Sequence, residues 1–326
     1  RAKMAATNQI LISDFLGQQG NATIVAGDGT NAVEIQRLFS NEGEYALFYF
    51  DPARPVGSTT HALDEMNPRL DDILDAWKPF LKEGDRGPAL VLDLSPRLSS
   101  ERRIEVESLI DERWPGIDRT WQWASRGSGR VDRLSLWLGS AAEPQCGRRF
   151  IRIPPDQYSA PLMLKSGKEN IEEQTVQKMF PRKGDRLTIL DSALVSCGMA
   201  PIWLDGVLQN DDRADWQVID GRRPIITHGE SLQLQHELDS YLIQCTGTVV
   251  SLIRGSLDEE NIEFIAEKAI DCGFNKLTIR TSLPPEIHPI LQGGIDRVLR
   301  RSSGSRSGFI TRTGADEHLL LCLENE

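Results

Sequence analysis

The first half of the chain alternates between helical spacing and short runs that are apolar at almost every position. Apolar residues three and four positions apart predict helices over 32–39 and 70–81. The apolar runs 45–50 and 89–94 predict strands that are buried on both faces. Strands of this kind that alternate with helices form a parallel sheet covered by helices, so the pattern predicts an α/β fold.

This half closes with a helix and a hairpin. Ser99 is the predicted N-cap of the helix that follows it. Segments 119–125 and 131–138 are rich in tryptophan and apolar residues and are joined by only five residues. Because so short a loop allows only antiparallel pairing, we expect the parallel sheet to end in an antiparallel hairpin.

A boundary between two domains, 1–142 and 143–326, is predicted where small polar residues precede Arg148-Arg149. In the second half, Asp191 is the predicted cap of a short helix over 192–199. The other predicted elements are strands over 202–207, 246–253 and 276–280, two short strands within 216–227, helices over 259–272 and 287–300, and a hairpin of 307–312 with 317–323. Together they predict a smaller α+β domain with one sheet and helices on one face.

The composition is that of a soluble globular protein of about two domains. The 326 residues are 39% hydrophobic, and no apolar stretch approaches the roughly 18 residues of a membrane span, so no membrane anchor is expected. Five scattered cysteines and five histidines without metal-ligand spacing favour reduced thiols, no bound metal and a cytoplasmic location. Because the chain begins with Arg1 inside a helical pattern, we expect it to be a fragment.

The charge balance is acidic, with 37 Lys and Arg against 48 Asp and Glu and a net charge of −11. This argues against a general basic coat for nucleic acid, but it permits a local patch. A basic cluster around a Ser/Gly loop near the C-terminus, extended by a predicted strand, comprises Arg297, Arg300, Arg301, Arg306, Arg312, Lys276 and Arg280. The cluster predicts contacts with an RNA backbone, and the alternative is a solvated helix end whose arginines interact with the helix dipole.

Two predicted strands end in acidic residues. A short β-branched run is followed by Gly27-Asp28-Gly29, and the strand over 45–50 is followed by Asp51-Pro52-Ala53-Arg54. Ligands of open parallel sheets bind beyond the carboxyl ends of the strands, so both acids are candidate site residues. The alternative for Asp28 and for Asp51 is a residue that only forms a turn, and for Arg54 it is a salt bridge to a neighbouring acid.

These features resemble the second half of a class I S-adenosylmethionine methyltransferase. Asp51-Pro52-Ala53-Arg54 resembles the Asp-Pro-x-Arg form of that superfamily's fourth motif, which occurs in RNA-modifying members, and Asp28 resembles the acid that contacts the adenine amine. Asn8 lies in a run that resembles the helix after the ribose-binding strand. In the second half, segments 187–195 and 273–280 and the closing hairpin resemble the C-terminal THUMP-like domain of a methyltransferase family.

The resemblance implies a partial Rossmann-like methyltransferase sheet followed by a THUMP-like α+β domain. It also implies S-adenosylmethionine as the cofactor and RNA (tRNA or rRNA) as the substrate, with the basic cluster as the RNA contact. The implied catalytic residues are Asp51, Pro52 and Arg54, and the implied cofactor contacts are Gly27, Asp28 and Asn8.

Two parts of the family pattern are missing from the sequence: the Gly-rich loop after the first strand and the acid that ends the second strand. We expect both upstream of Arg1 and therefore expect the chain as given to be inactive. The motif is not Asn-Pro-Pro-Tyr, so methylation of an exocyclic amine is less favoured. Two alternatives remain: an inactive methyltransferase-like RNA-binding or assembly factor, and a nucleotide-dependent oxidoreductase, which the terminal hairpin disfavours.

Overall fold

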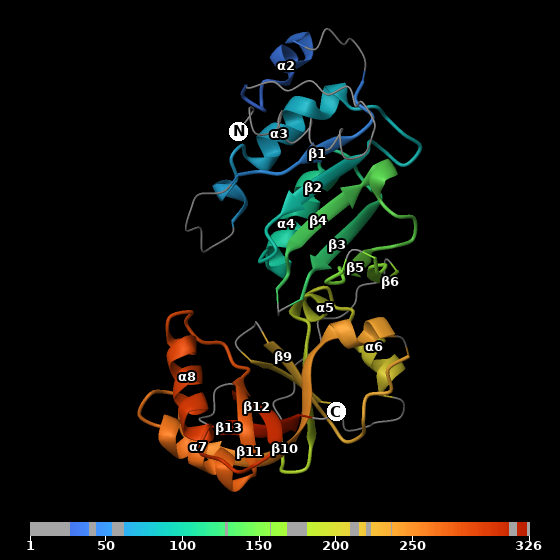
Figure 1. Ribbon diagram of the computed structural model, residues 1–326. Helices are drawn as coiled ribbons and strands as arrows, with labels where there is room; N and C mark the ends of the chain where they lie inside the picture. The colour runs from blue at the N-terminus through green and yellow to red at the C-terminus, as the bar shows by residue number, and fades with distance from the viewer. Residues whose placement is uncertain are drawn as a thin grey trace. The chain divides into compact units, whose positions relative to one another are not determined.

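The computed structural model (Figure 1) describes residues 27–38, 44–53, 62–127, 130–156, 158–167, 181–208, 215–219, 223–235, 237–312 and 318–324. The chain forms two compact units. Unit 1 comprises Arg1–Thr120 and Ser135–Pro144, and unit 2 comprises Trp121–Leu134 and Gln145–Glu326. The helical pattern at the start of the chain and the β-branched run before Gly27 lie outside the described residues, and the predicted boundary between residues 142 and 143 stays a prediction.

The helices predicted over 32–39, over 70–81 and after Ser99 are present. They are α2 (Ala32–Leu38), α3 (Leu70–Trp77) and α4 (Ser100–Asp111), with 3-10 turns η1 (Leu63–Glu65), η2 (Lys78–Phe80) and η3 (Gly139–Ala141). Ser99 caps α4 as predicted, because its hydroxyl oxygen accepts from the backbone N–H of Arg102 at 3.4 Å. Helix α3 stops earlier than predicted because Pro79 has no N–H to continue it.

The first sheet has six strands in the order β1-β2-β4-β3-β5-β6. The strands are β1 (Phe48–Phe50), β2 (Leu90–Leu94), β3 (Arg119–Ser125), β4 (Arg133–Leu138), β5 (Arg148–Arg152) and β6 (Leu162–Ser166). β1 and β2 are parallel, as the two apolar runs predict. β5 pairs parallel with β3 and antiparallel with β6, and sequence analysis did not anticipate either β5 or β6.

The second sheet belongs to unit 2 and has seven strands in the order β11-β12-β13-β10-β7-β9-β8. They are β7 (Arg186–Leu190), β8 (Asp215–Ile219), β9 (Arg223–His228), β10 (Ile243–Arg254), β11 (Phe274–Ile279), β12 (Arg306–Arg312) and β13 (His318–Glu324). The helical segments of this unit are α5 (Ser192–Ser196), α6 (Ala200–Val207), η4 (Glu237–Leu242), α7 (Ile262–Asp271) and α8 (Ile287–Leu299). The predicted strands over 246–253 and 276–280, both helices and the closing hairpin are confirmed.

The strand predicted over 202–207 is wrong, because the segment is helix α6. Ala200, Trp203, Leu204 and Val207 are buried, and their spacing of three and four positions marks one face of a helix. Pro201 in the first turn is tolerated there because the N–H that it lacks has no partner within the helix. A short apolar run is ambiguous between strand and helix, which explains the error.

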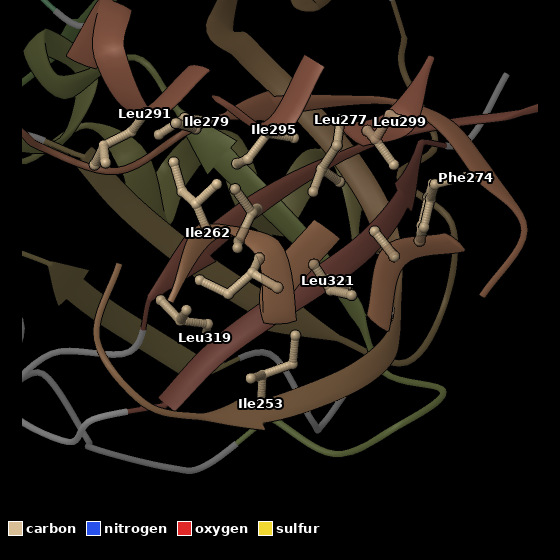
Figure 2. Packing of buried hydrophobic residues seen from close by; sticks show 13 residues of the cluster. Ile253, Ile262, Phe274, Leu277, Ile279, Leu291, Ile295, Leu299, Leu319 and Leu321 are labelled. Carbon is tan, nitrogen blue, oxygen red and sulfur yellow. The ribbon is translucent and has the colours of Figure 1, made fainter. Parts of the chain in front are cut away.

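The core of unit 2 lies between its sheet and the helices α7 and α8 (Figure 1). Figure 2 shows how Ile262 from α7 and Leu291 and Ile295 from α8 meet Leu277 and Leu321 of the strands. A second buried cluster comprises side chains from strands alone: Leu187, Ile189, Ile225, Cys245, Val249, Phe309, Leu320 and Cys322. Apolar side chains on both faces stabilise the sheet by removing apolar surface from water.

The five cysteines are free thiols, as predicted, and all but Cys272 are buried. Burial raises the pKa of the Cys197 thiol to about 12, so this thiol stays protonated and unreactive near neutral pH. Within the described ranges, no helix reaches the length and apolar character that a bilayer crossing demands.

Candidate functional site

Asp28 lies in an exposed turn just before α2. Its Oδ1 accepts hydrogen bonds from the backbone N–H of Thr30 at 2.9 Å and from the Thr30 hydroxyl at 2.8 Å. These bonds hold the pKa of Asp28 below its usual value, so the side chain is a carboxylate at neutral pH. Among the residues that the structure describes, none has an atom within 4 Å of a methyl group built on Gly27.

Asp51 follows β1 directly, at the carboxyl end of the strand. Its side chain is exposed and has no hydrogen bond or ion pair among the residues that the structure describes. Pro52 is buried, and Ala53 exchanges backbone hydrogen bonds with Asn67 at 3.0 and 3.2 Å. The loop backbone is therefore fastened on both sides of Asp51 while its carboxylate faces water. Arg54 lies outside the described residues, as does Asn8.

The turns that carry Asp28 and Asp51 are anchored by the same segment, Asn67–Trp77, in unit 1. The indole N–H of Trp77 donates to the carbonyl oxygen of Gly29 at 2.7 Å. The Trp77 ring also lies 5.5 Å from the ring of Phe48 in β1, which helps to hold the strand that leads to Asp51. Two exposed carboxylates on turns with fixed backbones can accept hydrogen bonds from amine or hydroxyl groups of a ligand.

Asp93, near the carboxyl end of β2, is a carboxylate that sequence analysis missed. It is 8% exposed and accepts hydrogen bonds from the Tyr49 hydroxyl at 2.5 Å and the Ser135 hydroxyl at 2.6 Å. The register of β1 and β2 ends with Phe50 beside Leu92, so Asp51 and Asp93 hold the next positions along the two strands. The sequence did contain a signal for it, because Asp93 is an acidic residue inside the apolar run 89–94. A carboxylate buried in such a strand needs hydrogen-bond partners.

A pocket of about 500 Å³ lies near the starts of α3 and α4 in unit 1. Its lining residues are Ala62, Leu63, Asp64, Arg69, Leu70, Asp71, Arg102, Ile104, Glu105, Ser108 and Leu109. Its arginines are ion-paired, Arg69 with Asp71 at 2.8 Å and Arg102 with Glu105 at 2.7 Å. The volume is within the range of small-molecule sites, and the lining combines apolar side chains with charged ones.

The structure divides the predicted basic cluster in two. Arg306 lies at the amino end of β12, and Lys276 lies near the amino end of β11, whose parallel pairing with β12 places both residues at one edge. Arg297, Arg300 and Arg301 are on the last turn of α8 or just after it, and all five side chains are exposed. We call these five residues the α8 basic cluster.

Arg280 and Arg312 do not belong to this cluster. Arg280 directly follows β11, and Arg312 is the last residue of β12. Both lie at the carboxyl end of the parallel pair, and the strand places Arg280 about 13 Å from Lys276. Both side chains are partly buried. The placement of Arg280 in one surface with Arg300 is therefore not supported by the topology.

No group of three or more His, Cys, Asp or Glu side chains within the described ranges could hold a metal ion. The candidate site is thus a set of carboxylates at strand ends in unit 1 and a set of exposed cations in unit 2.

Comparison with known proteins identifies a fold. No family model matches the sequence, and no curated protein matches it. The crystal structure of a "putative methyltransferase from Porphyromonas gingivalis W83" matches with a TM-score of 0.53 and 12% identity. The match covers 93% of this chain and 64% of that protein, so the chain spans less than two thirds of its length.

A second match, to the crystal structure of TrmN from Thermus thermophilus, has 12% identity and covers 44% of this chain and 46% of that one. Its TM-score of 0.26 supports no argument. The first match and the observed strand order agree on one conclusion: the chain has a methyltransferase-like α/β fold.

Proposed function

We propose that this chain is part of an S-adenosylmethionine-dependent methyltransferase that acts on RNA, either tRNA or rRNA, in the cytoplasm. The observation that carries the proposal is the parallel β1–β2 pair, followed in the sheet by β4 and β3, with Asp51-Pro52 at the carboxyl end of β1. In this proposal residues 1–142 belong to the cofactor-binding domain and residues 143–326 form a THUMP-like domain that presents RNA.

The residues at the Asp28 turn fit one end of the cofactor. Oδ1 of Asp28 accepts both hydrogen bonds from Thr30, which leaves Oδ2 available to accept from an adenine amine. Glycine at position 27, with no described atom near its Cα hydrogens, would let a flat ring approach the backbone closely. The cofactor itself would supply an activated methyl group, so the chain's own task is to position the acceptor.

Asp51 would orient the acceptor nucleophile or take its proton, because its exposed carboxylate stands at the end of a strand whose backbone is fixed. Asp93, Tyr49 and Ser135 support this position by hydrogen bonds that tie β1 to β2 and β2 to β4. The pocket between α3 and α4 would accommodate part of the acceptor, since its lining includes Arg69 and Leu70, which follow closely after Asn67, the residue that anchors Ala53. Arg54 would contact a phosphate or base edge.

The RNA part of the proposal depends on the α8 basic cluster. Its five cations are exposed, and none has an ion pair with a carboxylate among the described residues. Unpaired cations on one edge of an otherwise acidic chain can exchange counterions for RNA phosphates at no cost in lost salt bridges.

The proposal is tested by isothermal titration of the full-length protein, of which this chain is a part, with S-adenosylmethionine, followed by methyl transfer to RNA. We expect saturable binding. Asp51→Ala should lower the transfer rate by about a hundredfold or more with a nearly unchanged melting temperature, because the side chain is exposed. Glu83→Ala, which removes another exposed carboxylate of unit 1, is the matched control and should retain full activity.

The absence of saturable binding would reject the enzyme and favour the alternative, an inactive methyltransferase-like protein that binds RNA or assists assembly. A large fall in melting temperature for Asp51→Ala would instead identify the residue as structural.

A further inference from the structure

Arg280 has an environment unlike that of the α8 basic cluster. It directly follows β11, its side chain is partly buried, and its Nε is buried without a hydrogen-bond partner. No carboxylate among the described residues pairs with its guanidinium. A cation withdrawn from water without a partner is costly, so its position needs a physical explanation.

The next residue has the same property. Thr281 is 1% exposed, and its hydroxyl oxygen is buried without a hydrogen-bond partner. More than nine in ten buried polar groups in folded proteins are hydrogen-bonded, so two consecutive residues with unsatisfied donors are unusual. A single ion or ligand that accepted hydrogen bonds from both residues would satisfy both groups.

Residues 280–282, which we call the Arg280 turn, are fixed against the neighbouring strand β12. The backbone N–H of Arg280 donates to the carbonyl oxygen of Ile310 at 2.8 Å, and the Thr311 hydroxyl donates to the carbonyl oxygen of Arg280 at 3.0 Å. The guanidinium of Arg312 donates to the carbonyl oxygen of Ser282 at 3.4 Å. A second arginine side chain therefore lies against the same turn, whose backbone is already ordered.

The place of the Arg280 turn in the fold favours a ligand. β11 and β12 are a parallel pair, and the turn follows the carboxyl end of β11 beside the last residues of β12, before α8. Ligands of α/β sheets bind at this edge. Two guanidiniums and a hydroxyl supply hydrogen-bond donors, and the guanidiniums supply two positive charges, a set that matches the oxygens of a phosphate group.

We propose that the Arg280 turn binds a phosphate group through Arg280, Thr281 and Arg312. The phosphate belongs either to an RNA backbone or to a free phosphate or phosphomonoester. This site is separate from the α8 basic cluster, and it does not depend on methyl transfer.

The test is thermal unfolding of the protein during titration with sodium phosphate, with sodium chloride holding the ionic strength constant. At about ten times the dissociation constant, phosphate should raise the melting temperature by roughly 3 °C. Arg280→Gln should weaken phosphate binding by about tenfold or more, since it removes a charge-assisted contact. Arg182→Gln, at an exposed arginine elsewhere in unit 2, is the control and should keep the full rise.

Thr281→Val separates binding from folding. In chloride alone this variant should be as stable as the wild type or more stable, because it removes an unsatisfied buried hydroxyl without changing the shape of the side chain. In phosphate it should gain less than the wild type does. A wild type that phosphate does not stabilise, or an equal gain in all variants, would overturn the proposal and leave hydration of the turn as the explanation.

A short RNA distinguishes the two sources of phosphate. If the site holds an RNA backbone, inorganic phosphate should compete with the RNA, and Arg280→Gln should weaken RNA binding. If it holds free phosphate or a monoester, RNA affinity should be unchanged in Arg280→Gln while the phosphate-dependent rise in melting temperature is lost.

Discussion

Asp191 is a carboxylate in unit 2 that is 1% exposed and surrounded by donors. Its Oδ2 accepts from the Ser125 hydroxyl at 2.8 Å and lies 3.4 Å from Nε of Arg152. Its Oδ1 accepts from the backbone N–H of Ala193 at 2.9 Å, so Asp191 caps α5 as the sequence predicts. Burial nevertheless outweighs these contacts and raises the pKa of Asp191 above its usual value of 3.8.

This raised pKa predicts the direction of a pH effect on stability. Below the unfolded pKa of 3.8, the protonated carboxyl contributes its full stabilisation to the folded state. This contribution to the free energy of unfolding is lost as the pH rises through the higher folded pKa. Asp191→Asn keeps the cap but does not titrate. Urea unfolding at a series of pH values should therefore show the wild type losing stability relative to Asp191→Asn as the pH increases. A relative gain would mean that the ion pair with Arg152 outweighs burial.

Two glycines of unit 2, one in a strand and one in a helix, differ in how much space surrounds them. Gly308 lies in β12, where a methyl group would overlap the carbonyl oxygen of Cys322 and the ring of Phe274. Gly293 lies in α8, where a methyl group would meet no atom of the described part of the chain within 4 Å. The same chemical change therefore tests strand packing at one position and helix propensity at the other.

We expect Gly308→Ala to lower the free energy of unfolding by about 1–3 kcal/mol, because a backbone carbonyl and a packed ring cannot both move aside. Gly293→Ala should raise it by about 0.5–1 kcal/mol, since alanine loses less conformational entropy in a helix. Denaturant unfolding measures both effects. Equal effects of the two substitutions would contradict the packing of β12 against β13 described above.

At the scale of the whole molecule, charge is distributed unevenly. The chain has a net charge of −11, yet the α8 basic cluster gathers five exposed cations at one edge of the second sheet. RNA affinity would therefore depend on the positive charge of this cluster, because the negative net charge of the chain repels RNA phosphates.

Reversal of two charges tests this dependence. Arg300→Glu combined with Arg301→Glu should weaken RNA binding and flatten the slope of log affinity against log salt by about 1.5, because each lost phosphate contact removes roughly 0.7–0.9 from it. Lys82→Glu combined with Lys183→Glu changes the net charge equally at exposed positions outside the cluster and serves as the control. An identical slope change in both double variants would exclude a localised RNA surface.

Local signals in the sequence predicted many elements correctly. The Ser99 cap, the Asp191 cap and the end of α7 at Gly273, whose φ of +83° suits glycine, depend on neighbours within a few residues. The same holds for the parallel strands β1 and β2, whose continuous apolar runs are visible along the chain.

Other features depend on partners far away in the chain, and no local pattern contains them. β5 gains its place by pairing with β3, and Asp93 is satisfied by hydroxyls from β1 and β4. Arg280 and Lys276 are four residues apart, yet they lie toward opposite ends of the same strand. Arg280 is partly buried in the turn after β11, whereas Lys276 is exposed. Hydrophobic periodicity and capping are short-range and can be read from the sequence, whereas strand pairing and the burial of polar groups are settled when distant segments compete for the same core.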